Sequence, residues 1–230
     1  MLKSNRVFAL TMLGLLLVSL PVFATTTTYT TQASFVGATS SLTTENFDGV
    51  TTPHTITSGD GTTTGAFGAL VFTANIANSG NLIVSSGFDT TSGSNYLGTD
   101  IGGTFASQDN FTVYLPFPSD AIGMYLLIGG PLSAGDFTLS AAGGTALSSA
   151  TPETTLADGT VVYYLGLTST SAFGSATLQV TTPGGPNDGP YWNIDDLSYE
   201  KAKSSTVPEP SSILLLGAGL AAVVRRVKKA

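Results

Sequence analysis

The chain of 230 residues contains no cysteine, which excludes disulfide scaffolds, thiolate zinc sites and cysteine nucleophiles. It is also poor in positive charge: its 8 Lys and Arg residues lie near the two ends, and residues 25–199 contain none. With 15 acidic residues the formal net charge is −7. Because nucleic-acid binding needs basic side chains that meet phosphates, this balance argues against a nucleic-acid partner. A single histidine cannot build a His-rich zinc site.

The first 24 residues carry the three zones of a secretory signal. Lys3 and Arg6 precede an apolar run from Val7 to Leu20, and small residues lead up to Ala24. The Sec translocon reads this order of zones. We therefore expect residues 1–24 to be a signal peptide that is cleaved after Ala24. An uncleaved anchor is the alternative, but the run is shorter than the roughly 20 residues that a spanning helix needs.

Three zones also follow one another near residue 230: a proline motif (Val207, Pro208, Glu209 and Pro210), an apolar segment (211–224) and a basic cluster that includes Arg225 and Arg226. Proline lacks an amide donor and keeps the backbone extended, so a processing enzyme can reach it. As a helix, the apolar segment would span about 21 Å against a hydrocarbon core of about 30 Å, which makes it a marginal anchor. The basic cluster favours the cytoplasmic side of the inner membrane and places the preceding residues outside.

These three zones resemble the PEP-CTERM sorting signal of Gram-negative bacteria. The resemblance implies an exosortase, a transpeptidase-like membrane enzyme, as the processing partner near the Pro-Glu-Pro. It also implies delivery to the cell surface or to an extracellular polysaccharide matrix. We accordingly expect a linker at 200–206 and a sorting signal at 207–230. The alternative is an ordinary tail anchor, in which the Pro-Glu-Pro is only a linker turn.

Residues 25–199 form one stretch, long enough for a single well-buried core. No window shows a helical period, and β-branched residues alternate in short runs bounded by Gly, Pro, Asn and Asp, which is typical of an antiparallel β-sandwich. The expected strands are 42–47, 69–76, 82–84, 111–117, 121–128, 137–139, 161–167 and 176–180. Segment 121–128 is apolar almost throughout and should be a central strand covered on both faces, whereas 85–109 should be a long loop or short edge strands.

Three short pieces resemble those of other PEP-CTERM exported proteins with a jelly-roll, carbohydrate-binding-module-like domain. They are Asn-Phe-Asp-Gly at 46–49, the segment 115–124 and the segment 193–199. The resemblance implies an all-β, two-sheet, jelly-roll-like sandwich for residues 25–199. It implies no activity.

The apolar phase of the last expected strand slips by one residue between Ile194 and Leu197. Such a slip needs either burial on both faces or a bulge at the intervening pair, Asp195 and Asp196. A bulge would aim both carboxylates at the same rim of the sandwich.

The acids of residues 25–199 have no basic partner, so each must be solvated, protonated, bonded by backbone or hydroxyl donors, or bound to a cation. Calcium takes six to eight oxygen ligands, and the first and last strands of jelly rolls often adjoin. We therefore expect a structural Ca²⁺ held by Asp195 or Asp196 together with Glu45 or Asp48. The alternative is that these acids are solvated and keep a secreted protein soluble.

Aromatic side chains next to polar ones provide a second candidate site, for glycans. Tyr191 and Trp192 precede Asn193, and flat rings stack on sugar faces while amides bond hydroxyls. Tyr163 and Tyr164 form another pair. The alternative is that these rings belong to the core, with the single Trp packed between the sheets.

No catalytic motif is evident. His54 lies in a Gly- and Thr-rich stretch without ligand spacing, and no Ser has a nucleophile elbow around it. We expect a non-catalytic, structural or adhesive exported protein that is associated with exopolysaccharide; the alternative is a secreted glycan-active hydrolase with a carboxylate pair. The tract 25–31, nearly all threonine, is consistent with a flexible end, an O-glycosylated segment or a β-arm. The regular Thr-x-Thr repeats that an ice-binding threonine array would require are not found.

Overall fold

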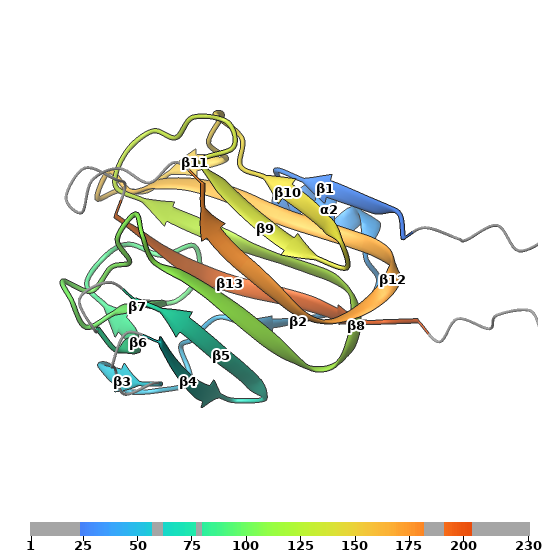
Figure 1. The fold of residues 1–230 in the computed structure, drawn as a ribbon. Helices are drawn as coiled ribbons and strands as arrows, with labels where there is room; N and C mark the ends of the chain where they lie inside the picture. Colours follow the sequence, from blue (N-terminus) through green and yellow to red (C-terminus); the bar gives the residue numbers. More distant parts are fainter. Residues whose placement is uncertain (1–23, 57–61, 77–79, 182–190, 204–230) are drawn as a thin grey trace, which may run out of the picture.

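The computed structural model describes residues 24–56, 62–76, 80–181 and 191–203. In these ranges the chain is built from antiparallel strands and one short helix (Figure 1). The elements are β1 (Thr26–Tyr29), α2 (Gln32–Ala38), β2 (Leu42–Glu45), β3 (His54–Thr55), β4 (Thr62–Phe67), β5 (Leu70–Asn75), β6 (Leu82–Ser86), β7 (Asn95–Thr99), β8 (Asn110–Ile128), β9 (Phe137–Ala141), β10 (Gly144–Leu147), β11 (Thr154–Thr155), β12 (Val161–Val180) and β13 (Trp192–Lys201). The predicted signal peptide and sorting signal lie outside the described residues. Across the described ranges, no helix has the length and hydropathy needed to cross a membrane.

Two long strands, β8 and β12, belong to both layers of the sandwich. Sheet 1 has the order β4-β5-β8-β12-β9-β10 and uses the first part of β8 and the last part of β12. Sheet 2 pairs the other halves of these two strands and adds β13, which is followed by β7, β6 and β3. β2 also pairs with β13, and β1 and β11 pair with the free side of β12. The predicted antiparallel β-sandwich is confirmed.

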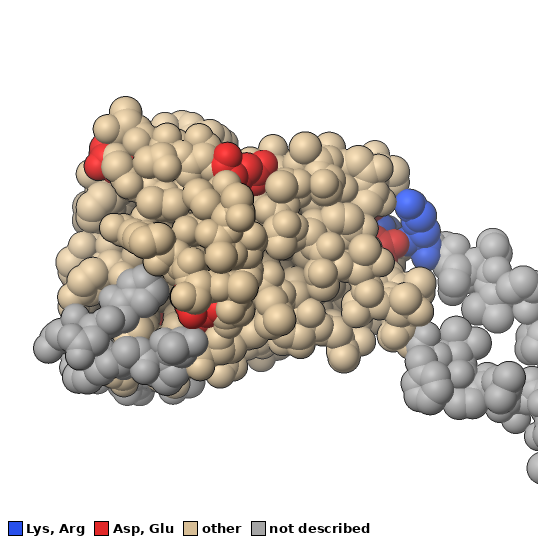
Figure 2. Space-filling model, turned by 90° about the horizontal axis from the view of Figure 1, so that it is seen from above, with Lys and Arg blue, Asp and Glu red and all other residues tan. Residues whose placement is uncertain are grey.

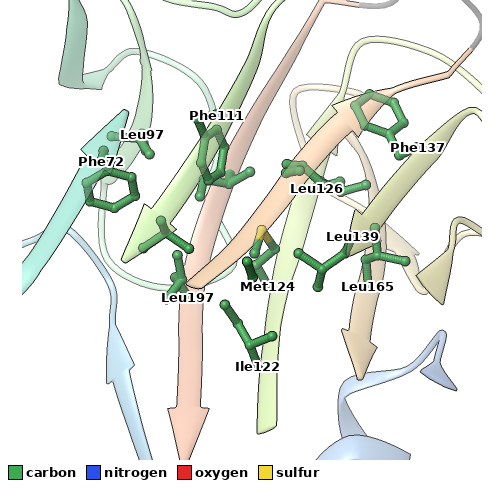
Figure 3. Close-up of a cluster of buried hydrophobic side chains, with 14 of the residues drawn as sticks. Phe72, Leu97, Phe111, Ile122, Met124, Leu126, Phe137, Leu139, Leu165 and Leu197 are labelled. Atoms are coloured by element: carbon green, nitrogen blue, oxygen red, sulfur yellow. The ribbon is translucent and has the colours of Figure 1, made fainter. Parts of the chain in front are cut away.

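The core lies between the two sheets and is filled by alternate side chains of their strands. Ile122, Met124 and Leu126 of β8 point into it, next to aromatic side chains such as Phe111 and Phe137 (Figure 3). All five side chains are fully buried. Removing such apolar surface from water is the dominant favourable term in folding.

The outer face of sheet 2 is covered as well. Leu127 packs with Tyr96 and Val162, and Phe35 of α2 packs on Tyr164. This second layer confirms the prediction that segment 121–128 is a central strand with apolar contacts on both faces.

The structure joins strands that the sequence separates. Segments 111–117 and 121–128 are one strand, β8, and segments 161–167 and 176–180 are one strand, β12. Expecting a stop at Pro118 was wrong because the strand continues through the bend between the sheets. Pro116 and Pro118 both lie where β8 has no pairing partner on β12, so their missing amide hydrogens break no bond there.

Three other segments differ from the sequence prediction or decide between its alternatives. The range 85–109 contains β7, which is buried along its length and lies inside sheet 2. Of the options for the threonine tract, the structure shows a β-arm, since β1 pairs with β12. The seven-residue helix α2 was not predicted; Thr31 caps it by accepting a hydrogen bond from the Ser34 amide.

The phenol of Tyr164 offers a test of the packing under α2. Its hydroxyl is buried and has no hydrogen-bond partner within the part of the chain that the structure describes. Because an unsatisfied buried hydroxyl costs about 1–3 kcal/mol, Tyr164→Phe should raise the free energy of unfolding by about 1 kcal/mol, measured by chemical denaturation. The neighbouring Tyr163→Phe is the control: its hydroxyl accepts a bond from the Leu132 amide at 2.9 Å, so its loss should destabilise. Equal destabilisation by both changes would contradict this assignment.

Candidate functional site

The last strand contains the bulge that the sequence offered as one of two explanations. The pairing of β13 with β8 shifts between Asp195 and Ser198, and Asp196 has a φ of 48°. As a result Ile194 and Leu197 face the same core. The bulge turns the two aspartates to one side of the strand, as β-bulges re-aim side chains.

Both carboxylates are held by the β6–β7 loop (residues 87–94). Asp195 Oδ2 accepts hydrogen bonds from the backbone amides of Thr91 and Ser92 at 3.0 and 3.1 Å. Asp196 Oδ1 accepts from the Ser92 hydroxyl at 2.6 Å, and Asp195 Oδ1 accepts from the Asp196 amide at 2.8 Å. Asp195 is fully buried and Asp196 nearly so. Donors of the backbone and of hydroxyl groups therefore satisfy oxygen atoms of both carboxylates.

The contacts of Thr91 Oγ1 can accommodate a proton at the pair. Thr91 Oγ1 lies 2.7 Å from Asp195 Oδ2 and 2.9 Å from Asp196 Oδ2, but a hydroxyl has only one hydrogen to donate. The second contact becomes a hydrogen bond when one carboxyl is protonated and donates to Thr91 Oγ1. Burial, and then the charge of Asp196, raise the pKa of Asp195 to about 7. The raised pKa of Asp195 therefore favours a proton at this pair near neutral pH.

The other two predicted calcium ligands lie on the segment that begins with β2. β2 pairs with β13, so Glu45 lies opposite Leu197, as expected for adjoining early and late strands. Asp48 Oδ1 accepts from the amides of Ser94 and Asn95, at 2.9 and 3.1 Å. Asp48 thus holds the far side of the same β6–β7 loop.

Among the described residues, no group of three or more His, Asp or Glu side chains is arranged to hold a metal ion. The structure brings Asp195 and Asp196 together but does not gather Glu45 and Asp48 around them. The calcium site stays a prediction that rests on the aspartate pair.

A pocket of about 580 Å³ opens at the end of the sandwich where β8 finishes and β13 begins. Its lining combines apolar and aromatic side chains with a few polar groups: Phe88, Ile101, Leu127, Tyr191, Thr104, Asp158, Thr160 and Asn193 among them. Tyr191, Ile101 and Phe88 are 54%, 44% and 43% exposed. Apolar walls with a small number of oriented polar groups are typical of ligand sites.

The glycan candidates are placed differently from one another. Tyr191 stands at the pocket mouth, and Asn193 lines the pocket. With its amide oriented to satisfy its surroundings, Asn193 donates to the carbonyls of Gly103 and Trp192 at 3.1 and 2.8 Å. Trp192 is fully buried and stacks on Phe105, with 4.2 Å between the ring centroids. Its ring is therefore not accessible to a ligand. Its place between the sheets is the alternative that the sequence left open.

Two reciprocal hydrogen bonds connect the segments on one side of the pocket. The Asp89 amide donates to Asp158 Oδ2 at 2.9 Å, and the Asp158 amide donates to Asp89 Oδ2 at 3.0 Å. The bond from the Asp89 amide is the main cause that lowers the pKa of the Asp158 carboxyl below its usual range. These two hydrogen bonds join the β6–β7 loop, which contains Phe88, to the turn before β12.

Sequence reasoning missed Phe88, Ile101 and Asp158 because the pocket is assembled from five separate segments. An aromatic residue in the polar stretch 85–109 was the one available signal. His54 is not in a loop: it lies in β3, half-buried, with its ring 5.7 Å from that of Phe67. Tyr163 and Tyr164 are buried and offer no ligand surface.

Charge is sparse on the visible surface. Figure 2 shows a mainly uncharged face with a few separated acidic patches, and basic atoms only at one end. In the described ranges the one ion pair joins Lys203 to Glu200 at 3.9 Å. Surface salt bridges therefore contribute little to the energetics of this domain.

Comparison with known families gives one match, outside the described residues. Residues 206–229 match the family model described as the PEP-CTERM protein-sorting motif. The chain carries this sorting motif. The match includes the Val207–Pro210 motif, Arg225 and Arg226, and it supports an exported protein that passes through a membrane-anchored intermediate and is processed by an exosortase. No curated protein matches the chain.

The aspartate pair predicts a pH-dependent stability. The folded pKa of Asp195, about 7, lies above its ordinary value of 3.8, so the stability due to this proton is fully present below about pH 3.8 and is lost as the pH rises through about 7. From pH 5 to pH 8, the free energy of unfolding of the wild type should fall by on the order of 2 kcal/mol more than that of Asp195→Asn. Asp100→Asn, at an exposed acid on another loop, should follow the wild-type profile. Parallel profiles for Asp195→Asn and wild type would contradict the assignment.

The calcium hypothesis predicts stabilisation that increases with pH, opposite to the effect of the proton, because a metal binds the ionised carboxylates. If the site exists, millimolar Ca²⁺ raises the melting temperature at pH 8 and much less at pH 5. Changing Asp195 and Asp196 together to Asn should abolish the rise, with Mg²⁺ as the control ion. A calorimetric titration without heat, together with an unchanged melting temperature, rejects the metal site.

Proposed function

We propose that this protein is a non-catalytic, polysaccharide-binding module of the cell surface or extracellular matrix, and that its ligand occupies the pocket at Tyr191. The observation that carries the proposal is the pocket itself, in which two exposed rings, Phe88 and Tyr191, accompany the polar groups of Asp158 and Asn193. Rings that stack on sugar faces, with nearby groups that bond hydroxyls, are the chemistry that a glycan requires. The likeness to jelly-roll, carbohydrate-binding-module-like domains is part of this proposal.

The direction of β13 fits an anchored, outward-facing module. Tyr191 precedes the first residue of β13, and the chain leaves the sandwich after Lys201 at its other end. Ten residues of strand span about 33 Å. Both ends of the described chain lie at the end of the sandwich opposite the start of β13 (Figure 1), which is where the pocket residues Tyr191 and Asn193 are. A tether to the sorting motif at residues 206–229 would thus hold the pocket away from the membrane.

Binding is favoured over hydrolysis by the acids at the pocket. A glycosidase places two carboxyl groups on either side of the scissile bond. Among the described residues, Asp158 is the only acid that lines the pocket, and its carboxylate accepts bonds from the backbone amides of Asp89 and Thr160. A secreted hydrolase is the second candidate, and the described part of the lining supplies no second carboxyl group for it.

The test is binding of the purified full-length protein to a glycan array, followed by calorimetry on the best polysaccharide. Tyr191→Ala should weaken binding about 3- to 10-fold because it removes a stacking ring. Gly129→Tyr should block the pocket, because Gly129 lines it and an added Cβ there meets no atom within 4 Å.

The control is Val36→Ala on α2, an exposed apolar side chain away from the pocket. It should bind as the wild type does. Wild-type protein that binds no polysaccharide would refute the proposed function, and cleavage of the bound glycan would replace it with the hydrolase.

A further inference from the structure

The register of sheet 1 aligns hydroxyl side chains in one row across all of its strands. Thr64 pairs with Thr73, Thr73 with Thr112, and Thr112 with Thr177. The row continues through Ser140 to Thr145. These positions point away from the core, because their neighbours along each strand, such as Phe72 and Leu178, are fully buried. At about 4.8 Å per strand, the row extends for about 24 Å. We call it the hydroxyl row.

The hydroxyl groups are partly paired with one another. Hydrogen bonds join Thr64 to Thr73 at 3.0 Å, Thr112 to Thr177 at 2.8 Å and Ser140 to Thr145 at 3.1 Å. Each bond uses one O–H of its pair, so one O–H and several lone pairs of every couple stay free to point outward. The row therefore presents free hydroxyl donors and acceptors at the spacing of the strands.

A row of amides runs beside it, two residues along each strand. Asn75 pairs with Asn110, Asn110 with Gln179, and Gln179 with Thr138. In the described residues, the side-chain amides of Asn75, Asn110 and Gln179 make no hydrogen bond to the protein, unlike the buried Asn95, which bonds two carbonyls. Their donors and acceptors face solvent.

On the other side of the hydroxyl row lies an exposed ring. Tyr114 is 45% exposed and pairs with Val71, which is 37% exposed. No Asp, Glu, Lys, Arg or His stands at an outward position of β4, β5, β9, β10 or the parts of β8 and β12 in this sheet. The outer face of sheet 1 is thus uncharged, with a ring, a hydroxyl row and an amide row side by side.

We infer that this face binds a neutral polysaccharide that lies across the strands, in addition to the glycan proposed for the pocket, and the inference rests on that proposed function. An uncharged face matches a polymer whose recognition groups are all hydroxyls. The amides and free hydroxyls can donate to and accept from them, while Tyr114 supplies a stacking surface. The strand spacing is similar to the advance of one sugar unit in an extended chain. An anionic polymer finds no cation on this face and meets a protein of net charge −7.

The experiment is affinity electrophoresis of the full-length protein in gels that contain hydroxyethyl cellulose or carboxymethyl cellulose, which share a backbone and differ in charge. The row variant combines Thr73→Val, Thr112→Val and Thr177→Val, which keep side-chain shape and strand preference but remove three hydroxyls. It should weaken retardation in the neutral gel by about tenfold. Gln179→Leu, an exposed single change, tests the face independently if the row variant does not fold.

Thr154→Val on β11 of sheet 2 is the matched control and should leave retardation unchanged. Weaker retardation of the row variant, with wild-type retardation of Gly129→Tyr, supports binding at this face. If only Gly129→Tyr loses retardation, the inference is overturned and the pocket proposal stands. If the wild type shows neither retardation nor binding on the array, both proposals are overturned. Stronger retardation in the anionic gel, or a dimer that the row variant abolishes without any retardation, also overturns the inference.

Discussion

The aspartate pair on the bulge of β13 organises the end of the sandwich that carries the pocket. No Lys or Arg lies between residues 25 and 199, and amide and hydroxyl donors compensate for the burial of Asp195 and Asp196. All of the partners from outside the strand come from the β6–β7 loop. The requirement to satisfy two buried carboxylates therefore fixes this loop, and with it Phe88 at the pocket wall.

The long strands β8 and β12 connect the pocket end of the sandwich to the rest of the molecule. Each begins in one sheet and ends in the other, so both layers are built on the same pair of strands. One part of this pair supports the pocket, since Leu127 and Ile128 of β8 line it. The other part carries Thr112 and Thr177 in the middle of the hydroxyl row. The two proposed glycan surfaces thus share one rigid support.

Much of the fold could be predicted because alternation along a strand is a local property. The apolar content of segment 121–128 predicted its burial on both faces, and the slip between Ile194 and Leu197 predicted either burial on both faces or the bulge that the structure shows. The continuity of β8 from Asn110 to Ile128 could not be predicted, because a bend that contains Pro116 and Pro118 has the same local sequence pattern as the end of a strand. Of the residues at the candidate sites, the sequence singled out Asp195, Asp196 and Tyr191 but not Phe88 and Asp158, since nothing local connects the last two.

The sequence by itself determined the export route and the fold class, because a sorting motif and β-alternation are read from neighbouring residues. It also determined that the acids of residues 25–199 have no Lys or Arg partner within that range. Only the tertiary structure decided which donors satisfy them, which rings are exposed and which hydroxyls align. The hydroxyl row shows the reason: no segment contains a regular threonine repeat, yet strand register brings six single residues from six strands into line. Register is set by the pairing of distant segments around a shared core, and a linear pattern does not contain it.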